Sequence, residues 1–428
     1  MSYQESLAYL YSLQKLGIKL GLANIRRLLE LLGNPHSSLK TVLVGGTNGK
    51  GSTAAMLAKM LAAGGYKVGL YTSPHLDDFR ERIKVGDSLI PEARVVELTA
   101  RMRKALALGS VLIPITFFEA VTALAYLHFN EEEIDLAVLE VGMGGRLDAT
   151  NTTRPLLSII TSVSRDHCQH LGSSLEQILA EKLEIARPGQ ALVSGITARR
   201  LTPLVKRYCR DRGAELFSLN KDFSYLAVRP RTMNYHGLSG SIDGLKLGLS
   251  GEHQMSNAAL ALAGGEILIH HGFDLRREHF RQGLKEVTWP GRLELIPTLP
   301  PVLLDIAHNP AGATALARAL RKEYNWNSLV IVLGIMADKD WPGVMRALLP
   351  LADKIITTSP QLPRACPPEE LAGYAKRRGV KVEIVPRVSE AVRQALERAG
   401  EDEMILVTGS IFTVSEARRF LCSLLTKN

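Results

Sequence analysis

The chain has 428 residues, of which 46% are hydrophobic and 22% charged, and its formal net charge at pH 7 is +9. This length predicts roughly two or three domains, and the composition is that of a folded globular protein, which excludes disordered and fibrous classes. The four cysteines lie far apart and form no CxxC pair, so the sequence predicts neither a disulfide framework nor a zinc site.

Charge and apolar patterning bear on location and partners. The N-terminus has no basic stretch followed by an apolar one, and no apolar run approaches the ~18 residues of a membrane span. Lysine and arginine are spread along the chain, with no run longer than Lys376-Arg377-Arg378. We therefore expect a cytoplasmic monomer that binds small anions such as nucleotides, without a membrane or nucleic-acid partner.

The first part of the chain alternates helical and strand patterns. A helical segment is predicted over 7–32, then an apolar strand at 41–44, a glycine-rich turn, and a helix over 52–63. Further buried strands are predicted at 67–71, 135–141, 156–162 and 191–195. Alternation of this kind predicts an α/β domain with a mainly parallel sheet that is covered by helices on both faces.

A change of pattern and a later proline-rich stretch divide the chain. Residues 215–250 are short, glycine-punctuated and alternating, which predicts a small antiparallel β insert in a first domain over 1–288. A linker is predicted at 289–301. The β/α alternation then resumes and predicts a smaller Rossmann-like α/β domain over 302–428, without a phosphate loop of its own. Its strands are predicted at 302–306, 329–334, 354–358, 380–385 and 404–408.

The clearest chemical motif is GTNGKGS (46–52), between a predicted strand and a predicted helix. The P-loop pattern GxxxxGK[ST] would place glycine at Val44 and Ser or Thr at Gly51, so this is a tighter GxxGKxS version. Its glycines let backbone N–H groups face an anion, the helix N-terminus adds positive potential, and Lys50 reaches the β and γ phosphates. The alternative is a strand–turn–helix corner in which the glycines serve only the turn.

Polar residues follow several of the predicted strands. Glu140 ends an apolar strand, where a carboxylate is costly unless it is paired or holds a metal such as Mg²⁺, and an ordinary solvated strand end is the alternative. Ser73 and His167 also follow strands. By itself Ser73 would count as a turn residue. A lone histidine is more often structural than a ligand, so spacing leaves the role of His167 undecided. Lys182 is by spacing alone a solvated lysine on a helix face.

In their order, these motifs resemble the Mur ligase superfamily and, within it, the folylpolyglutamate synthase and dihydrofolate synthase family. The resemblance spans nearly the whole chain and implies a Mur-ligase central domain followed by a glutamate-ligase domain. The matching segments are GIKLGLANIRRLLELLGNP (17–35), GTNGKGS (46–52), TSPH (72–75), TFFE (116–119), EVGMGGRLDATN (140–151), DH (166–167), EK (181–182), GEHQMSNAALAL (251–262), WPGRLE (289–294), DIAHNP (305–310), ADKD (337–340), TSP (358–360) and VTGSIFTVSEAR (407–418).

The resemblance implies roles that spacing cannot assign. It implies catalytic roles for Lys50, Lys182 and His167, and an N6-carboxylated form of Lys182. The implied ATP contacts are Gly49, Lys50, Gly51, Ser52, Asn257, Arg292 and Asp305. The implied ligands of Mg²⁺, as two ions, are Ser73, Glu140 and His167. The implied substrate residues are Phe118, Glu119, Arg146, Asp148 and His308.

Two residues depart from the family pattern. Arg165 lies before Asp166-His167, where the family pattern has an apolar residue, and Glu184 occupies a position that is commonly glycine. Both add charge beside the implied metal region, so we expect an effect on substrate preference or on local geometry. Neither departure removes an implied ligand.

The implied activity is an ATP-dependent amide ligase that adds L-glutamate to folates and to dihydropteroate through an acyl phosphate. A cell-wall Mur ligase acting on a UDP-sugar peptide is the nearest alternative. The motifs at 46–52 and 72–75 favour the folate branch, and the short segment before Gly46 leaves no room for a UDP-binding domain. A P-loop switch should carry NKxD, but residues 220–223 lack the final Asp. Scattered charge argues against a nucleic-acid-binding protein.

Overall fold

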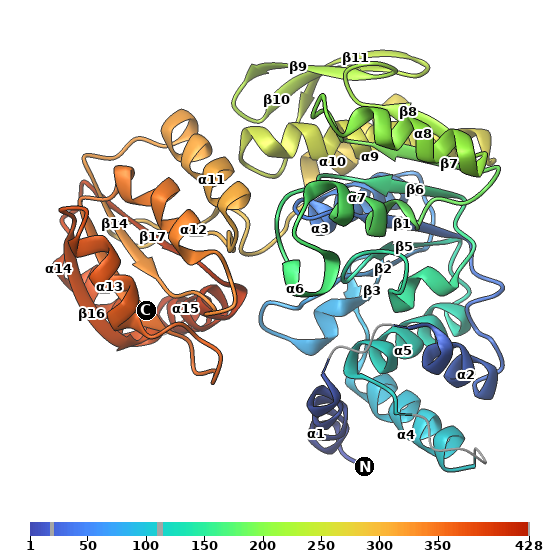
Figure 1. Ribbon diagram of the computed structural model, residues 1–428, viewed down its shortest axis with the longest axis horizontal. Coiled ribbons are helices and arrows are strands. Elements are labelled where there is room, and N and C mark those ends of the chain that lie inside the picture. Colours follow the sequence, from blue (N-terminus) through green and yellow to red (C-terminus); the bar gives the residue numbers. More distant parts are fainter. Residues whose placement is uncertain (18–20, 109–113, 427–428) are drawn as a thin grey trace. The chain divides into compact units, whose positions relative to one another are not determined.

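The computed structural model describes residues 1–17, 21–108 and 114–426, and the chain divides into two compact units (Figure 1). Unit 1 comprises Met1–Val228, Thr232–Leu247 and Ser256–Val287. Unit 2 comprises Arg229–Arg231, Gly248–Met255 and Thr288–Asn428. Most of unit 2 is therefore one C-terminal segment, to which two short pieces from the neighbourhood of the expected β insert are added.

Unit 1 is built around an eight-stranded sheet. Across the sheet the strands are β4 (Ser88–Leu89), β3 (Ile83–Val85), β2 (Val68–Tyr71), β5 (Leu136–Glu140), β1 (Thr41–Gly45), β6 (Leu157–Ile160), β7 (Ala191–Ser194) and β8 (Glu215–Ser218). All neighbours from β2 to β8 pair in parallel, and only the β2–β3 and β3–β4 pairs are antiparallel. Because β5, β1 and β6 are parallel neighbours, the loops after their carboxyl ends leave the same edge of the sheet.

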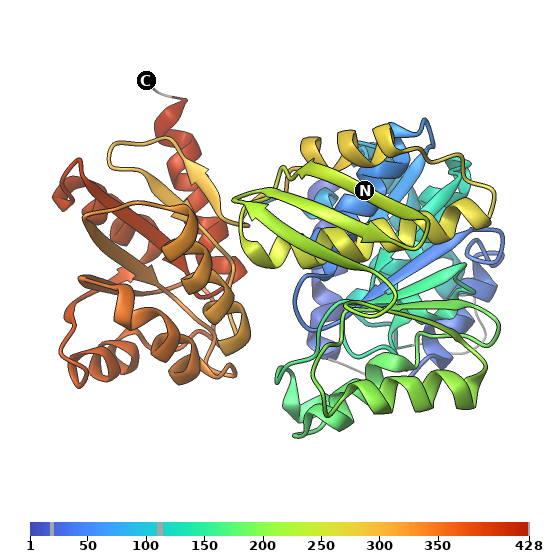
Figure 2. The same ribbon diagram turned by 90° about the horizontal axis from the view of Figure 1, so that it is seen from above.

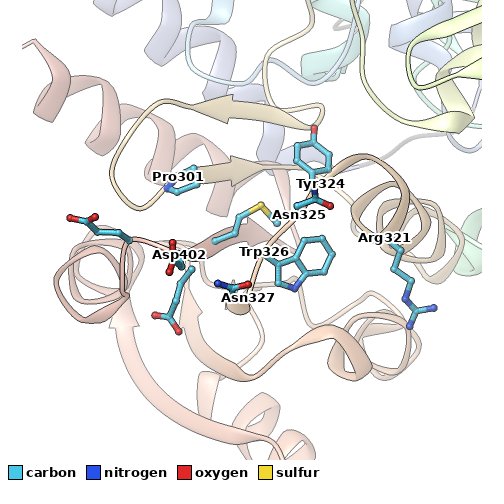
Figure 3. A pocket seen from close by; sticks show the side chains of 10 residues that line it. Pro301, Arg321, Tyr324, Asn325, Trp326, Asn327 and Asp402 are labelled. Carbon is cyan, nitrogen blue, oxygen red and sulfur yellow. The ribbon is translucent and has the colours of Figure 1, made fainter.

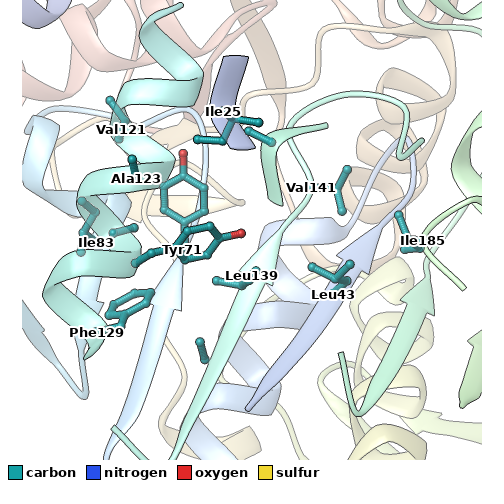
Figure 4. Packing of buried hydrophobic residues seen from close by; sticks show 14 of the residues in the cluster. Ile25, Leu43, Tyr71, Ile83, Val121, Ala123, Phe129, Leu139, Val141 and Ile185 are labelled. Carbon is teal, nitrogen blue, oxygen red and sulfur yellow. The ribbon is translucent and has the colours of Figure 1, made fainter. Parts of the chain in front are cut away.

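Helices cover both faces of this sheet. On one face α3 (Lys50–Ala63) packs on the strands and on α10 (Arg277–Glu286), so closely that a Cβ on Gly283 would lie 2.5 Å from the Met60 backbone. On the other face lie α5 (Phe117–Glu131), α2 (Ala23–Leu31) and α4 (Glu92–Leu108). Figure 4 shows Tyr71 and Leu139 of this face beside Phe129 of α5. Burial of these side chains stabilises the fold by about 1.5–3 kcal/mol each.

The single helix predicted over 7–32 is wrong. The structure has α1 (Tyr3–Ser12), a 3-10 turn η1 (Leu13–Leu16), and then α2 from Ala23. Gly17 has φ +64, a left-handed value that a right-handed helix cannot continue through. Residues 18–20 of the predicted helix lie outside the described residues.

The range 215–250, expected to be a small β insert, contains strands of two different sheets. A three-stranded antiparallel sheet consists of β9 (Ser224–Arg229), β10 (Thr232–Gly237) and β11 (Gly240–Lys246), whereas β8 pairs in parallel with β7 as an edge of the main sheet. β8 is partly exposed, and this exposure explains its weaker apolar pattern. The remaining elements of unit 1 are η2 (Phe79–Arg82), η3 (Ala149–Thr152), α6 (Cys168–Leu171), α7 (Leu175–Leu183), α8 (Thr202–Arg212) and α9 (Glu252–His270), the last of which begins in unit 2.

Unit 2 is a second α/β sandwich (Figures 1 and 2). Its strand order is β12 (Glu294–Ile296), β13 (Val302–Leu304), β17 (Glu403–Thr408), β14 (Ser328–Leu333), β15 (Lys354–Ser359) and β16 (Lys381–Arg387), parallel except between β12 and β13. The helices α11 (Pro310–Glu323), α12 (Trp341–Leu348) and α13 (Pro368–Lys376) pack on the sheet around one apolar core, and a 3-10 turn η4 (Leu349–Leu351) follows α12. The helices α14 (Val388–Arg398) and α15 (Ile411–Leu425) pack against each other and against strands of the same sheet.

The predicted α/β fold class, with a large mainly parallel sheet and a smaller second sheet, is confirmed. Strand β12 falls inside the range that was expected to be a linker. Among the described residues, no helix has both the length and the apolar character that crossing a bilayer requires.

Candidate functional site

The loop between β1 and α3 has a backbone that only glycine accommodates. Gly46 has φ +143, and Gly49, the N-cap of α3, has φ +86. A Cβ on Gly46 would lie 1.9 Å from Thr161 Oγ1, and one on Gly49 would lie 2.3 Å from Asn257 Oδ1. Both glycines are therefore required by conformation and by space. The first N–H groups of α3 have no carbonyl partner within the helix and point out of its end, where an anion would be stabilised.

Polar residues after β6 hold this loop in place. Asn48 O accepts hydrogen bonds from Thr161 Oγ1 at 2.7 Å and from Ser162 Oγ at 2.9 Å. The Asn48 and Thr47 N–H groups donate to Ser162 Oγ and Ser162 O, at 3.0 and 2.8 Å. Sequence reasoning missed Thr161 and Ser162. The available signal was their position at the carboxyl end of β6, the neighbour of β1, where polar side chains reach the binding edge.

Lys50 and Glu140 come together at this edge. Lys50 Nζ lies 4.0 Å from Glu140 Oε1 and donates to Thr47 O at 3.2 Å. The other carboxylate oxygen of Glu140 accepts a hydrogen bond from Ser73 N at 3.1 Å. Glu140 is therefore a buried, paired carboxylate rather than a solvated strand end.

The donor set at this place fits Mg²⁺. Within the described residues, no group of three or more His, Cys, Asp or Glu side chains forms a ready-made metal site. Mg²⁺ differs from metals that need such a cage, because it keeps several waters and binds through one or two carboxylates and the substrate phosphates. Glu140, which accepts a hydrogen bond from Ser73 N, would supply the carboxylate of such a site.

His167 occupies the loop after β6. Its φ is +50 at the start of α6, its imidazole is 40% exposed, and Nε2 lies 3.9 Å from Asp166 Oδ1. The Asp166 carboxylate is buried and also accepts a hydrogen bond from His167 N. The structure thus places His167 at the carboxyl end of the strand beside β1, and its role as a metal ligand stays a prediction.

Lys182 is buried, so its interpretation as a solvated surface lysine is wrong. It lies in the last turn of α7, is 4% exposed, and its Nζ donates to Gly46 O at 2.8 Å. Burial, followed by the positive charge of Lys50, lowers the pKa of Lys182 from 10.5 to about 7, against the opposing charges of Asp166 and Asp148. An amine with this pKa is substantially neutral at physiological pH and is therefore a nucleophile.

The residues expected at the substrate have distinct surroundings. Asp148 is buried and accepts hydrogen bonds from Met143 N at 2.9 Å and Thr150 Oγ1 at 2.6 Å, and burial raises the pKa of its carboxyl. Phe118 packs on Gly142, where a Cβ would lie 2.6 Å from the ring. The Glu119 carboxylate accepts from its own helix start, at Thr116 N and Oγ1, both at 2.8 Å. Glu119 therefore has a capping role, and its contact with a substrate stays a prediction.

Glu181 and Glu184, the acidic residues on either side of Lys182, form ion pairs with arginines. The exposed Arg146 guanidinium lies 2.9 Å from the Glu181 carboxylate. Of the two departures from the family pattern, Arg165 is exposed, and the Glu184 carboxylate lies 2.9 Å from Arg212 of α8. The charge of Glu184 is thus balanced locally.

Three of the expected site residues, Arg292, Asp305 and His308, lie in unit 2, close in sequence to β12 and β13. Asp305 follows β13 and is buried, with its two carboxylate oxygens accepting from Ala307 N at 2.9 Å and Leu293 N at 3.1 Å. Burial raises the pKa of Asp305, and the positive charge of Arg292 opposes this shift. Arg292 Nε is buried without a hydrogen-bond partner among the described residues. His308 Nδ1 lies 3.0 Å from Ile306 O.

Unit 2 also contains a cavity of about 560 Å³ (Figure 3), and its lining does not include Arg292, Asp305 or His308. Trp326, Asn327 and Asp402, which line it, precede β14 and β17 and therefore mark the amino ends of these parallel strands. Ligands of open α/β sheets bind at the carboxyl ends, where Asp305 and His308 follow β13. The cavity is thus at the wrong end of the sheet for the nucleotide.

Two family models match the chain: the Mur ligase middle domain over residues 44–265, and the Mur ligase glutamate ligase domain over 291–411. A *Bacillus subtilis* dihydrofolate synthase/folylpolyglutamate synthase is 32% identical over 98% of this chain and 99% of its own length. A probable bifunctional folylpolyglutamate synthase/dihydropteroate synthase from *Haloferax volcanii* is 36% identical over 98% of this chain, which spans 50% of that relative.

Among solved structures, the *Mycobacterium tuberculosis* folylpolyglutamate synthase complexed with ADP and AMPPCP matches with a TM-score of 0.90. It is 34% identical, and the match covers 98% of this chain and 99% of that chain. Both family models occur in the predicted order, and the likeness extends over nearly the full chain. The chain therefore belongs to the Mur ligase family and, within it, to the folylpolyglutamate synthase and dihydrofolate synthase family.

Proposed function

We propose that this chain is an ATP-dependent ligase that joins L-glutamate to the carboxylate of folates and of dihydropteroate. The observation that carries the proposal is the phosphate loop in which Lys50 lies 4.0 Å from the buried Glu140. The relatives named above support it, because the *Bacillus subtilis* protein bears both synthase names and the *Mycobacterium tuberculosis* protein was crystallised with ADP and AMPPCP.

The proposed reaction overcomes a poor leaving group. The carboxylate oxygen of the pterin-bearing substrate attacks the γ-phosphorus of ATP, the bond to the bridging oxygen breaks, and ADP leaves. The glutamate amine then attacks the acyl phosphate carbon, phosphate leaves with the bonding electron pair, and the amine loses a proton. Phosphoryl transfer needs positioning and charge neutralisation more than covalent help. Lys50 and the N–H groups at Gly49, Gly51 and Ser52 supply both.

Three further residues are proposed to contact ATP. Asn257, whose side chain fills the space where a Cβ on Gly49 would lie, would border the phosphates, and Arg292 and Asp305 would also bind the nucleotide. The buried Arg292 Nε without a hydrogen-bond partner among the described residues supports a role for that side chain in holding an anion.

Ser73, Glu140 and His167 would hold Mg²⁺, as two ions. The ions would neutralise charge on the phosphates. Lys182 would carry an N6-carboxyl group: its neutral amine attacks CO₂, an N–C bond forms, one C=O electron pair moves to oxygen, and a proton leaves the nitrogen. The buried position of Lys182 and its lowered pKa support this step, which requires an unprotonated amine.

The pterin-bearing substrate would lie against Phe118 and the loop that carries Arg146 and Asp148, with Glu119 fixing the start of α5. His308, at the carboxyl end of β13, would contact glutamate or the growing product. Monomeric state and cytoplasmic location stay predictions. The relatives do not favour a UDP-sugar peptide ligase.

Substrate-dependent ADP release tests the proposal. ADP and phosphate should form only when ATP, L-glutamate and either dihydropteroate or a reduced folate are all present. A Lys59→Ala variant, which changes a partly exposed lysine of the same helix α3, serves as the matched control for Lys50→Ala. Turnover with UDP-sugar peptides and none with folates would overturn the substrate assignment.

A further inference from the structure

Asn151 lies where the loop after β5 meets the end of α7. It is 3% exposed, and its side chain uses every one of its polar atoms. Nδ2 donates to Arg146 O and to Glu184 O, both at 3.3 Å, and Oδ1 accepts from Arg187 Nη2 at 2.6 Å. One side-chain amide therefore joins the loop after β5 to the segment 184–187 that follows α7.

Arg187 completes this junction from the other side. Its Nη2 also donates to Asn151 O at 3.0 Å, and its Nη1 donates to Glu184 O at 3.0 Å. These acceptors are neutral amide and carbonyl oxygens, so they stabilise the half-buried guanidinium less than a carboxylate would. A fork of two fixed N–H directions instead specifies the geometry of the segments that it joins. We call the two side chains the Asn151–Arg187 clamp.

The clamp satisfies the end of the helix that carries Lys182. Helix α7 ends at Leu183, and the last carbonyl groups of a helix have no partner within it. Glu184 O, just beyond the end, receives hydrogen bonds from both members of the clamp. The helix end is thereby fixed one residue after the turn in which Lys182 lies.

Direct backbone contact continues the same junction up to Lys182. Arg146 N donates to Glu181 O at 3.0 Å. A Cβ on Gly145 would lie 2.9 Å from Lys182 O, so the loop and the helix touch at the residue itself. The loop segment 145–151 also contains Asp148, whose charge acts on the Lys182 amine. The separation of Asp148 and Lys182 is thus set by how this loop sits on α7.

We propose that Asn151 and Arg187 are positioning residues for Lys182: by fixing the end of α7 against loop 145–151, they hold Lys182 Nζ at Gly46 O beneath the phosphate loop. The expected effect on kcat rests on the proposed function. The expected placement of the Lys182 amine does not depend on that function. Neither side chain touches substrate, nucleotide or the reacting atoms in this proposal.

A double-mutant cycle separates positioning from general stabilisation. Asn151→Ala should lower kcat by about tenfold, with KM for ATP within about twofold of the parent. On a Lys182→Ala background, the same change should lower kcat by less than about twofold, because the residue through which it acts is gone. The melting temperature should fall by the same amount on both backgrounds. Arg187→Lys, which keeps the charge and loses the fork, should repeat the pattern and replaces Asn151→Ala if that variant does not fold.

Arg212→Gln is the matched control, because Arg212 binds the carboxylate of Glu184 and not the Glu184 carbonyl oxygen to which the clamp donates. It should leave kcat unchanged. Crystal structures give a readout that does not depend on activity: the 2.8 Å contact of Lys182 Nζ with Gly46 O should be lost in the clamp variants and kept in Arg212→Gln. An equal loss of kcat on the Lys182→Ala background, or an unmoved amine in both clamp variants, would overturn the proposal. A parent protein that ligates nothing would instead overturn the proposed function.

Discussion

The amine of Lys182 and the carbonyl of Gly46 form a hydrogen bond of 2.8 Å between residues that are 136 positions apart in the sequence. This contact ties the end of α7 to the first residue of the phosphate loop. The amine is buried, and burial together with the positive charge of Lys50 lowers its pKa to about 7.

Replacing Lys182 should abolish most turnover while the fold is kept. Lys182→Ala should lower kcat at least ~10-fold, because the proposed carbamate would be lost together with the contact to Gly46. Acetate or formate filling the space should restore part of the rate. Lys182→Glu should restore it only in part, because its side chain is shorter than a carboxylated lysine. Turnover at several acetate concentrations measures this, and full activity of Lys182→Ala in CO₂-free buffer would show that the amine has no part in the reaction.

The stability of the protein should depend on pH through Lys182. The folded-state pKa is about 7 and the ordinary value is 10.5, so between these pH values the unfolded chain binds a proton that the folded chain does not. The free energy of unfolding therefore rises with pH between about 7 and 10.5, and Lys182 contributes up to about 1.4 kcal/mol per pH unit to this rise. Below about pH 7 the amine is protonated in both states, so Lys182 contributes no such rise. The measurement is urea unfolding in CO₂-free buffer from pH 6 to 9, with Lys182→Met as the non-titrating reference.

The difference between the parent and Lys182→Met cancels the titration of other groups. We expect the parent to gain relative to the variant as the pH rises above about 7. The unfolding free energy of the parent minus that of the variant should therefore increase with pH. A value that stays constant over this range, or that falls as the pH rises, would contradict the lowered pKa.

Gly49→Ala should impair nucleotide binding far more than Gly65→Ala. The two glycines have nearly equal φ, +86 and +87, so alanine meets the same backbone strain of about 1–2 kcal/mol at each. At Gly65 nothing lies within 4 Å of an added Cβ, whereas at Gly49 the Asn257 side chain lies at 2.3 Å. Calorimetric titration with ADP should show loss of binding for Gly49→Ala only. Equal effects would mean that strain, and not the space at the loop, decides binding.

Lys50→Ala should lower kcat at least ~100-fold with little change in melting temperature, since a phosphate-binding cation acts in the transition state. Lys59→Ala, on the same helix and paired with the exposed Asp87, should retain full turnover. Near-normal activity of Lys50→Ala would identify the loop as a structural corner.

Local patterns in the sequence predicted the elements and the phosphate loop, because their causes are local. The glycines at 46 and 49 predicted a loop whose N–H groups can face an anion, and both residues have a positive φ. Apolar runs indicated the parallel strands, and β1, β5 and β6 were found within a residue or two of the predicted bounds. Gly17 was an equally local signal for the helix break, but the apolar periodicity on both sides obscured it.

Contacts between distant segments could not be predicted in this way. The burial of Lys182 depends on Gly46, and the Asn151–Arg187 clamp depends on the path of the loop after β5, so neither leaves a pattern in its own neighbourhood. Strand β8 was assigned to the insert because its exposed edge resembles the alternation of β9 to β11. The family resemblance selected Lys182 where spacing did not, although it gave no physical reason for the choice.

The most direct measurement is the fate of oxygen from the reacting carboxylate. Dihydropteroate or a reduced folate labelled with ¹⁸O in that carboxylate is incubated with ATP, L-glutamate and the protein, and the products are separated by mass. We expect a pterin product that is heavier by one glutamyl residue, and inorganic phosphate that carries ¹⁸O, because the acyl phosphate transfers a carboxylate oxygen to phosphorus. Formation of ADP without a glutamylated product, or a glutamylated product with unlabelled phosphate, would contradict ligation through an acyl phosphate.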